Sequence, residues 1–298
     1  MTAQIIDGKQ VAADMRAELK DEVAKLKEQG IVPGLGVILV GDDPASKSYV
    51  TAKERTCEEI GIYSDDNRLP ADTPQEDLIA LIKKMNADPK INGILVQLPL
   101  PKGLNEAEVL LTIDPDKDVD GFHPTNVGKM VVGEKAFLPC TPHGIIQLLI
   151  RSGVSIEGAN VVIVGRSNIV GKPLANMLIQ KKPKGNATVT VCHTRTRDLG
   201  WHTKQADIVI AAAGRSNTVT ADMIKEGAVV IDVGVNRVED ATKKKGYRLV
   251  GDVDFEAVKE KASLITPVPG GVGPMTITML LYNTVESAKR AAGLAPSN

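Results

Sequence analysis

The chain has 298 residues, enough for one large hydrophobic core or two smaller ones, and the usual size of domains favours two. Its 36 basic and 37 acidic residues leave a net charge of −1, which argues against a nucleic-acid-binding or membrane-binding surface. The N-terminal residues lack a signal pattern, no apolar run is long enough to span a membrane, and Cys57, Cys140 and Cys192 fit neither a disulfide framework nor a metal site, so we expect a cytoplasmic protein without a metal.

The first hundred residues alternate between helical periodicity and short apolar runs. Helices are predicted over residues 10–29, 46–60 and 75–86, where apolar side chains recur every three or four positions. Strands are predicted over residues 35–40 and 93–98, which are short and continuously apolar. This alternation predicts a parallel sheet covered by helices. An acidic loop over residues 114–121 and a connecting helix over residues 142–150 follow.

A second alternating set begins after Gly158. Its predicted strands are short and rich in β-branched residues, and they cover residues 160–164, 188–192, 208–211 and 229–233. Helices are expected between them, the clearest beginning near Val170, and a final helix is expected over residues 276–292. The pattern predicts a compact, doubly wound domain of the dinucleotide-binding type.

Two glycine-rich loops stand out. The first, from Gly165 to Gly171, joins an apolar strand to a helix, an arrangement in which glycine lets the backbone approach a phosphate and the helix offers free N–H groups. Its spacing differs from G-x-G-x-x-G, and Pro173 stands where a Walker A loop needs Ser or Thr. The second loop covers residues 267–276.

Three further features have both a functional and a plain structural interpretation. Tyr49 and Lys53 are four residues apart, on one face of a predicted helix, which is also typical of a surface helix. Gln97 ends a buried strand, at the edge where parallel sheets bind ligands. The loop from Asp116 to Gly121 starts like an EF-hand but has Val127 at the twelfth position, so it is either a solvated turn or the source of a carboxylate for a neighbouring cleft.

Taken together, seven segments in order along nearly the whole chain resemble the bifunctional methylenetetrahydrofolate dehydrogenase/cyclohydrolase family. They are residues 48–53 (SYVTAK), 93–101 (GILVQLPLP), 116–122 (DKDVDGF), 139–142 (PCTP), 164–173 (VGRSNIVGKP), 232–236 (DVGVN) and 269–276 (PGGVGPMT). The Tyr-x-x-x-Lys pair also occurs in short-chain dehydrogenases, but there it follows the dinucleotide glycines, whereas Lys53 precedes Gly165 by over a hundred residues.

The resemblance implies an α/β fold with two domains and a cleft between them. Residues 1–140 and 277–298 would form an α/β folate-binding catalytic domain, and residues 141–276 a Rossmann-type NADP-binding domain. The implied reactions of one-carbon metabolism, which serve purine biosynthesis, are oxidation of 5,10-methylenetetrahydrofolate by NADP and hydrolysis of the product to 10-formyltetrahydrofolate. A homodimer formed through the cofactor domains is also implied.

The resemblance also implies roles for individual residues. Lys53 would be the catalytic lysine, supported by Gln97, while Tyr49 would stack on the aminobenzoate ring and Asp120 would bind the pterin. The full implied substrate site is Tyr49, Lys53, Val96, Gln97, Leu98, Pro99, Asp120, Pro269, Gly270 and Gly271. The implied cofactor site is Gly165, Arg166, Ser167, Ile169, Thr194, Arg195, Ala213, Gly214, Val235 and Thr276.

The choice of NADP over NAD depends on charge. No Asp or Glu ends the strand over residues 188–192, where NAD enzymes often bind the ribose hydroxyls, and arginines follow instead. The candidates for binding the 2′-phosphate are Arg166 and, in second place, Arg195. Two alternatives remain open at this point: a dehydrogenase without the hydrolytic step, and a folate- or nucleotide-binding regulator. The presence of Tyr49, Lys53, Gln97 and Asp120 together argues against the regulator.

Overall fold

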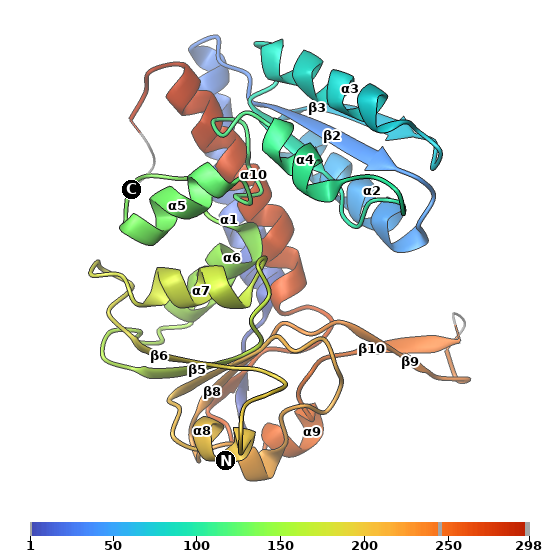
Figure 1. Ribbon diagram of the computed structural model, residues 1–298. Coiled ribbons are helices and arrows are strands. Elements are labelled where there is room, and N and C mark those ends of the chain that lie inside the picture. Colours follow the sequence, from blue (N-terminus) through green and yellow to red (C-terminus); the bar gives the residue numbers. More distant parts are fainter. Residues whose placement is uncertain (1, 244–245, 296–298) are drawn as a thin grey trace. The chain divides into compact units, whose positions relative to one another are not determined.

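A computed structural model describes residues 2–243 and 246–295 (Figure 1). Within these residues the chain divides into two compact units. The three-stranded unit contains residues 14–140 and 277–295, and the six-stranded unit contains residues 2–13 and 141–276. Each is an α/β structure whose main sheet is parallel, which confirms the fold class expected from the alternation of strands and helices.

The three-stranded unit is built on a parallel sheet with the order β3-β2-β4. Its strands are β2 (Gly34–Val40), β3 (Tyr63–Leu69) and β4 (Gly93–Val96), and its helices include α2 (Pro44–Ile60), α3 (Gln75–Ala87), α4 (Glu106–Thr112) and α5 (Pro124–Val132). Every residue of the central strand β2 is buried. Ile38 and Val40 pack with apolar side chains of α3 and α4 on one face of the sheet. This core fixes the positions of β2 and β4, and therefore the points from which the loops after these strands start.

Local signals at its ends define α2, the helix that carries Tyr49 and Lys53. The carboxylate of Asp43 accepts a hydrogen bond from the Ser46 backbone N–H at 2.7 Å, and proline occupies the first turn. Gly61 ends the helix in the left-handed region, with φ of 89°, and its N–H bonds back to the carbonyl of Cys57.

Two features of this unit differ from the sequence prediction. Strand β3 was not predicted, because its sequence YSDDNRL is largely polar; it is an edge strand that pairs in parallel with β2. Strand β4 ends at Val96 rather than at residue 98, so Gln97 and Leu98 lie just beyond the carboxyl end of the strand.

The main sheet of the six-stranded unit has the strand order β1-β11-β8-β7-β5-β6, and all six strands of this sheet are parallel. The strands are β1 (Gln4–Ile5), β5 (Asn160–Val164), β6 (Thr188–Cys192), β7 (Ile208–Ala211), β8 (Val229–Asp232) and β11 (Leu264–Ile265). The helical segments are α6 (Cys140–Arg151), α7 (Gly171–Leu178), α8 (Leu199–Thr203), η1 (Ala221–Met223) and α9 (Phe255–Val258), while α1 (Gly8–Glu28) and α10 (Val272–Ala291) each continue from one unit into the other. β9 (Asn236–Glu239) and β10 (Tyr247–Val250) form an antiparallel hairpin that extends away from this sheet (Figure 1).

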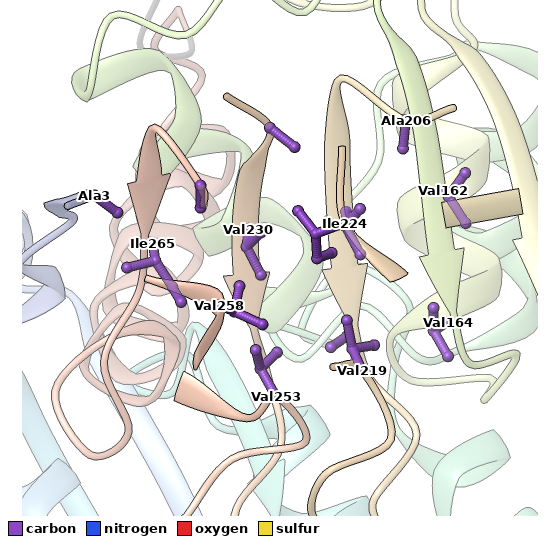
Figure 2. Packing of buried hydrophobic residues seen from close by; sticks show 14 of the residues in the cluster. Ala3, Val162, Val164, Ala206, Val219, Ile224, Val230, Val253, Val258 and Ile265 are labelled. Atoms are coloured by element: carbon purple, nitrogen blue, oxygen red, sulfur yellow. The ribbon is translucent and has the colours of Figure 1, made fainter. Parts of the chain in front are cut away.

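Aliphatic side chains build the core of the six-stranded unit, as the low aromatic content of 3% requires. Figure 2 shows side chains on neighbouring strands, among them Ile265, Val230 and Val162, arranged along the sheet. Ile224 and Val258, from the connections between strands, cover them. Branched aliphatic residues of this kind favour buried parallel strands. The sequence prediction located β5, β6, β7 and β8 within a residue of their bounds, but it missed the two-residue strand β11.

The first residues of the chain belong to the six-stranded unit, whereas the sequence prediction grouped residues 1–140 with the folate-binding domain. Gln4 and Ile5 pair with Leu264 and Ile265 and so extend the sheet by a strand. Gly8 packs so closely that a β-carbon there would lie 1.8 Å from the carbonyl oxygen of Gly271. A two-residue strand has no periodicity, so no local pattern could have revealed this pairing. None of the helices in the described part of the chain has the length and apolarity needed to cross a bilayer.

Candidate active site

Lys53 and Gln97 meet at the carboxyl edge of the three-stranded sheet. The Nζ atom of Lys53 donates a hydrogen bond to Oε1 of Gln97 at 2.9 Å, and the lysine is only 7% exposed. Gln97 directly follows β4, and its Nε2 donates to the carbonyl of Leu98 at 2.7 Å, so the amide oxygen faces the lysine. Because β2 and β4 are adjacent and parallel, the helix after one strand and the loop after the other bring these side chains together.

Asp120 reaches the same edge because the preceding residues run alongside β4. The N–H of Ile94 donates to the carbonyl of Lys117 at 2.8 Å, and Ile94 and Asp118 form an isolated parallel bridge. Asp120 follows two residues later and is half-buried. Its charge acts on Lys53, and the two groups perturb each other electrostatically.

Burial dominates the protonation of this pair. Desolvation lowers the pKa of Lys53, and the negative charge of Asp120 opposes part of that change. Desolvation raises the pKa of Asp120 to about 6, while the positive charge of Lys53 counteracts it. A lysine with a lowered pKa can lose and regain a proton closer to neutral pH than an exposed lysine can.

The acidic loop is a folded structure whose carboxylates have separate roles. Asp118 is buried, and its two oxygens accept hydrogen bonds from the N–H groups of Phe122 and His123 and from the side chain of Asn126, at 2.8 to 3.2 Å. These contacts tie the loop to the start of α5, so of the two sequence interpretations, a solvated turn describes exposed Asp116 but not Asp118. Within the described ranges, no three or more His, Cys, Asp and Glu side chains are grouped as a metal would require.

The other predicted substrate residues of the three-stranded unit surround this edge. Tyr49 lies one turn before Lys53 on α2 and is 43% exposed. Val96 is the buried last residue of β4, and Leu98 and Pro99 follow it, joined by a cis peptide bond. The remaining predicted substrate residues, Pro269, Gly270 and Gly271, belong to the six-stranded unit, between β11 and α10.

The predicted cofactor residues gather at the carboxyl edge of the six-stranded sheet. The strand ends are level, because Val164 is paired with both Cys192 and Ala211, and Ala211 with Asp232. The chain leaves β5 for β6 on one side and returns to β7 on the other, so the loop after β5 occupies the switch point where such sheets bind ligands. The residues placed at this edge are Gly165, Arg166, Ser167 and Ile169 after β5, Thr194 and Arg195 after β6, Ala213 and Gly214 after β7, and Val235 after β8.

The loop after β5 has the compact backbone that a phosphate needs. Gly165 has φ of 138°, and a β-carbon there would lie 2.1 Å from the carbonyl oxygen of Ala212. A β-carbon at Gly171 would lie 2.1 Å from the carbonyl oxygen of Gly165. Ser167 accepts a hydrogen bond from the Val170 N–H at 3.1 Å, and α7 starts without a side-chain cap. This cradle fits a dinucleotide pyrophosphate.

The side chains at this edge are available to a ligand. Arg166, Ser167, Ile169, Thr194, Arg195, Ala213, Gly214 and Val235 are all exposed. Thr276, at the start of α10, is hydrogen-bonded through its hydroxyl to the hydroxyl of Thr141 at 2.9 Å.

Comparison with known proteins identifies the family. The model of the tetrahydrofolate dehydrogenase/cyclohydrolase catalytic domain matches residues 6–120, and that of the NAD(P)-binding domain of the same family matches residues 139–292. The chain belongs to the tetrahydrofolate dehydrogenase/cyclohydrolase family. It is 61% identical over 295 residues to the bifunctional protein FolD of Dehalococcoides mccartyi, covering 99% of each chain.

Solved structures of family members have the same fold. The FolD methylenetetrahydrofolate dehydrogenase/cyclohydrolase of Campylobacter jejuni matches with a TM-score of 0.91 and 50% identity, over 97% of this chain and 99% of the other. The Trypanosoma brucei enzyme, crystallised with NADP and an inhibitor, matches with a TM-score of 0.93 and 41% identity, over 98% and 99%.

In this tetrahydrofolate dehydrogenase/cyclohydrolase chain, one buried residue that the sequence analysis missed supports the Asp120 loop. Asn283 of α10 donates from its side chain to the carbonyls of Val119 and Leu138, at 2.8 and 3.0 Å. The thiol of Cys140 also donates to the Val119 carbonyl, at 3.3 Å. A lone asparagine among apolar helix residues is the signal that could have revealed this role.

A second missed residue is Asp252, which follows the hairpin of β9 and β10. Its carboxylate accepts hydrogen bonds from the backbone of Ala213 and Gly214, two predicted cofactor residues. Nothing in the local sequence Gly251-Asp252-Val253 distinguishes this aspartate from a surface residue, because its partners come from distant segments.

Proposed function

We propose that this chain is a bifunctional one-carbon folate enzyme. It oxidises 5,10-methylenetetrahydrofolate to 5,10-methenyltetrahydrofolate with NADP and then hydrolyses the product to 10-formyltetrahydrofolate. The observation that carries this proposal is the buried Lys53, with a lowered pKa, hydrogen-bonded to Gln97 and facing the charge of Asp120.

Asp120 and Tyr49 are proposed to bind the two aromatic parts of the folate. A carboxylate can accept two parallel N–H bonds from a 2-aminopyrimidinone ring, and Asp120 presents one beside the lysine. The exposed phenol ring of Tyr49, one helical turn away, is suited to stack on the aminobenzoate. Val96, Leu98 and Pro99 contribute the strand end against which the substrate lies, and Pro269, Gly270 and Gly271 complete the proposed substrate site.

Oxidation of the methylene carbon requires little acid–base catalysis by the protein. The carbon lies between two nitrogens, so loss of hydride leaves a cation delocalised over both. Bound NADP supplies the hydride acceptor. The residues of this chain orient the reactants, and Lys53 contributes position and charge.

Hydrolysis of the methenyl product requires proton movement, which is the proposed task of Lys53. The attacking water must lose a proton, and a ring nitrogen must gain one when the intermediate collapses. A buried lysine with a lowered pKa can take the first proton and supply the second. The amide oxygen of Gln97 holds the Nζ atom in place through both steps.

NADP is the proposed cofactor because the residues at the carboxyl edge of the six-stranded sheet fit its phosphates and rings. The Gly165 cradle would hold the pyrophosphate together with Ser167 and Ile169, and the remaining contacts would come from Thr194, Ala213, Gly214, Val235 and Thr276. Arg166, with Arg195 as a second candidate, would pair with the 2′-phosphate. We further propose a cytoplasmic homodimer, joined through the cofactor-binding domains, with purine biosynthesis as its metabolic context. Its mass in solution, compared with the chain mass of 31.7 kDa, tests the dimer.

A product assay tests the function. Purified chain is mixed with methylenetetrahydrofolate and NADP, and reduced cofactor, methenyl and formyl products are followed together. Stoichiometric reduced cofactor and formyl product support two activities. Reduced cofactor with accumulating methenyl product would instead identify the second candidate, a dehydrogenase without hydrolysis. Binding of both ligands without any product would identify a regulator.

A further inference from the structure

A buried carboxylate, that of Asp252, joins the loops that follow β7 and β8. Its Oδ2 accepts hydrogen bonds from the backbone N–H groups of Ala213 and Gly214, at 2.6 and 2.8 Å. Its Oδ1 accepts one from the side chain of Asn236, at 2.9 Å. Asp252 is completely buried, so three N–H groups rather than water stabilise its charge.

Asp232, at the end of β8, fixes the backbone that carries Asp252. Its Oδ1 accepts from the N–H groups of Asp252 and Gly234, at 2.8 and 3.0 Å, and its Oδ2 accepts from Val253 at 3.0 Å. The N–H of Asp232 in turn donates to the Thr266 hydroxyl at 2.7 Å. Asp252 is therefore held to the sheet through its backbone and holds the loops through its side chain.

Two glycines show how closely this network is packed. A β-carbon at Gly234 would lie 2.1 Å from Oδ1 of Asp252, and one at Gly251 would lie 1.7 Å from Oδ2 of Asp232. Both distances are far below van der Waals contact, so the carboxylates occupy space that any larger residue would fill.

Because of this network, the loops after β7 and β5 differ in whether their backbone N–H groups can bind a phosphate. After β7, the N–H groups of Ala213 and Gly214 point to a carboxylate, so they cannot bind a phosphate. After β5, the Gly165 cradle leads into the uncapped start of α7. A phosphate is thereby directed to the loop after β5, away from two buried carboxylates that would repel it.

We propose that Asp252 is a positioning residue for the cofactor. It holds Ala213 and Gly214 directly, and Val235 through Asn236, in the backbone conformation that binds NADP. The inference rests on the proposed function, because the roles of Ala213, Gly214 and Val235 come from it. Asp252 acts through these loops and does not itself touch the cofactor.

The test replaces the carboxylate with an amide of the same shape. In Asp252→Asn, one acceptor becomes a donor, which faces either the two backbone N–H groups or the Asn236 side chain. We expect the Kd of NADP, measured by titration calorimetry, to rise about tenfold, as for loss of a charged hydrogen bond. Hydrolysis of methenyltetrahydrofolate in the absence of cofactor should stay at the wild-type rate, since Lys53 belongs to the other unit.

Two further variants make the test specific. Asp254→Asn is the matched control: its carboxylate caps α9 by accepting from the Ala257 N–H, which an asparagine can also do, so the NADP Kd should not change. The double variant Asp252→Asn, Asn236→Asp exchanges donor and acceptor across the pair and should recover part of the lost affinity. A general loss of stability would not be recovered by this exchange.

An unchanged NADP Kd in Asp252→Asn would overturn the proposal, as would an equal loss of NADP binding and hydrolysis. If this variant does not fold, Asn236→Ser, which removes one bond to the carboxylate, decides the matter: weaker NADP binding with intact hydrolysis supports the proposal, and unchanged binding overturns it. Failure of the wild-type chain to bind NADP would instead refute the proposed cofactor, before any variant is compared.

Discussion

Lys53 has different tasks in the two proposed reactions, so one substitution should separate them. Lys53→Gln keeps polarity and approximate length but cannot carry a proton near neutral pH. We expect hydrolysis to fall by about 10²–10⁴-fold, whereas part of the dehydrogenase activity survives and methenyltetrahydrofolate accumulates. The measurement compares methenyl absorbance with NADPH formed.

Lys47→Gln is the matched control, because Lys47 lies on the same helix but forms an exposed ion pair with Asp42. Both activities should persist in it. Hydrolysis at the wild-type rate in Lys53→Gln would mean that another residue moves the protons.

Asp120 should make folate binding depend on pH. Its pKa is raised to about 6, and only the ionised form offers two acceptor oxygens to the pterin. Affinity for tetrahydrofolate should therefore be full above this pKa and weaken as the pH falls through about 6. Titration calorimetry between pH 5 and pH 8 measures it.

The Asp120→Asn variant should bind folate weakly and lose this acidic decline, while exposed Asp116→Asn, in the same loop, should keep the wild-type profile. An acidic decline that persists in Asp120→Asn would assign it to a different group or to the ligand.

Arg166 should distinguish the two dinucleotides. If its guanidinium pairs with the 2′-phosphate, Arg166→Ala should weaken NADP binding by roughly 1.5–3 kcal/mol and leave NAD binding nearly unchanged. Dissociation constants for both dinucleotides measure this, with Arg55→Ala as a control, because Arg55 lies on α2 and forms an exposed ion pair with Glu59. Equal losses for NADP and NAD would show that Arg166 does not read the phosphate.

At the residue scale, sequence reasoning could bring together side chains that follow neighbouring strands. The position of Gln97 at a strand end pointed to the ligand edge, and the structure places it against Lys53. Asp252 could not be found in this way, because its partners Ala213 and Gly214 are 39 and 38 residues away and contribute only backbone atoms. Almost any residue type can donate a backbone N–H, so the residue types of the partners do not reveal such a hydrogen bond.

Among the elements, β5 provides a matched pair of glycines for testing the phosphate cradle. Gly158, before the strand, and Gly165, after it, both have positive φ, but only Gly165 has a backbone atom where a β-carbon would lie. Gly158→Ala should cost about 1–2 kcal/mol of unfolding free energy, from the backbone conformation alone. Gly165→Ala should cost more and also abolish NADP binding.

Denaturant unfolding and NADP titration of both variants check this expectation. If Gly165→Ala binds NADP as tightly as Gly158→Ala does, the close approach of Gly165 to Ala212 has no part in the cofactor site.

The strands differed greatly in how well the sequence predicted them. β2 and the strands β5, β7 and β8 of the six-stranded sheet are almost entirely buried and consist of apolar runs, so their positions followed from composition. β3 is an edge strand with a largely polar sequence, YSDDNRL, and it was not predicted because its backbone pairing with β2, rather than an apolar pattern, makes it a strand. Pairing between distant backbones, unlike burial, is not encoded in local composition.

Considering the molecule as a whole, bound cofactor should stabilise the native chain by mass action. At a concentration of NADP one hundred times its Kd, the free energy of unfolding should rise by about 2.7 kcal/mol. Thermal unfolding with and without NADP measures the shift, which should be smaller for NAD and for Arg166→Ala at the same concentration. No shift in the wild type would contradict the proposed cofactor.

The grouping of distant segments was the part of the architecture least accessible to sequence. The order of motifs gave two α/β domains, but not the transfer of residues 2–13 to the six-stranded unit. Likewise, Asn283 supports the Asp120 loop from a helix more than 160 residues later. Such contacts join segments that are far apart in the sequence, and hydrophobic periodicity predicts only local structure.

The pairing of β1 with β11 has a consequence for synthesis on the ribosome. Leu264 and Ile265 are translated roughly 260 residues after their partners, Gln4 and Ile5, a delay on the order of tens of seconds. Throughout that interval the nascent N-terminal strand has no neighbour in its sheet. Once β8 (Val229–Asp232) has been made, its edge also stays uncovered until β11 follows. Chains that terminate prematurely between residues 232 and 264 would keep the edge of β8 uncovered, and such an edge is a surface that chaperones and other unfinished chains can bind.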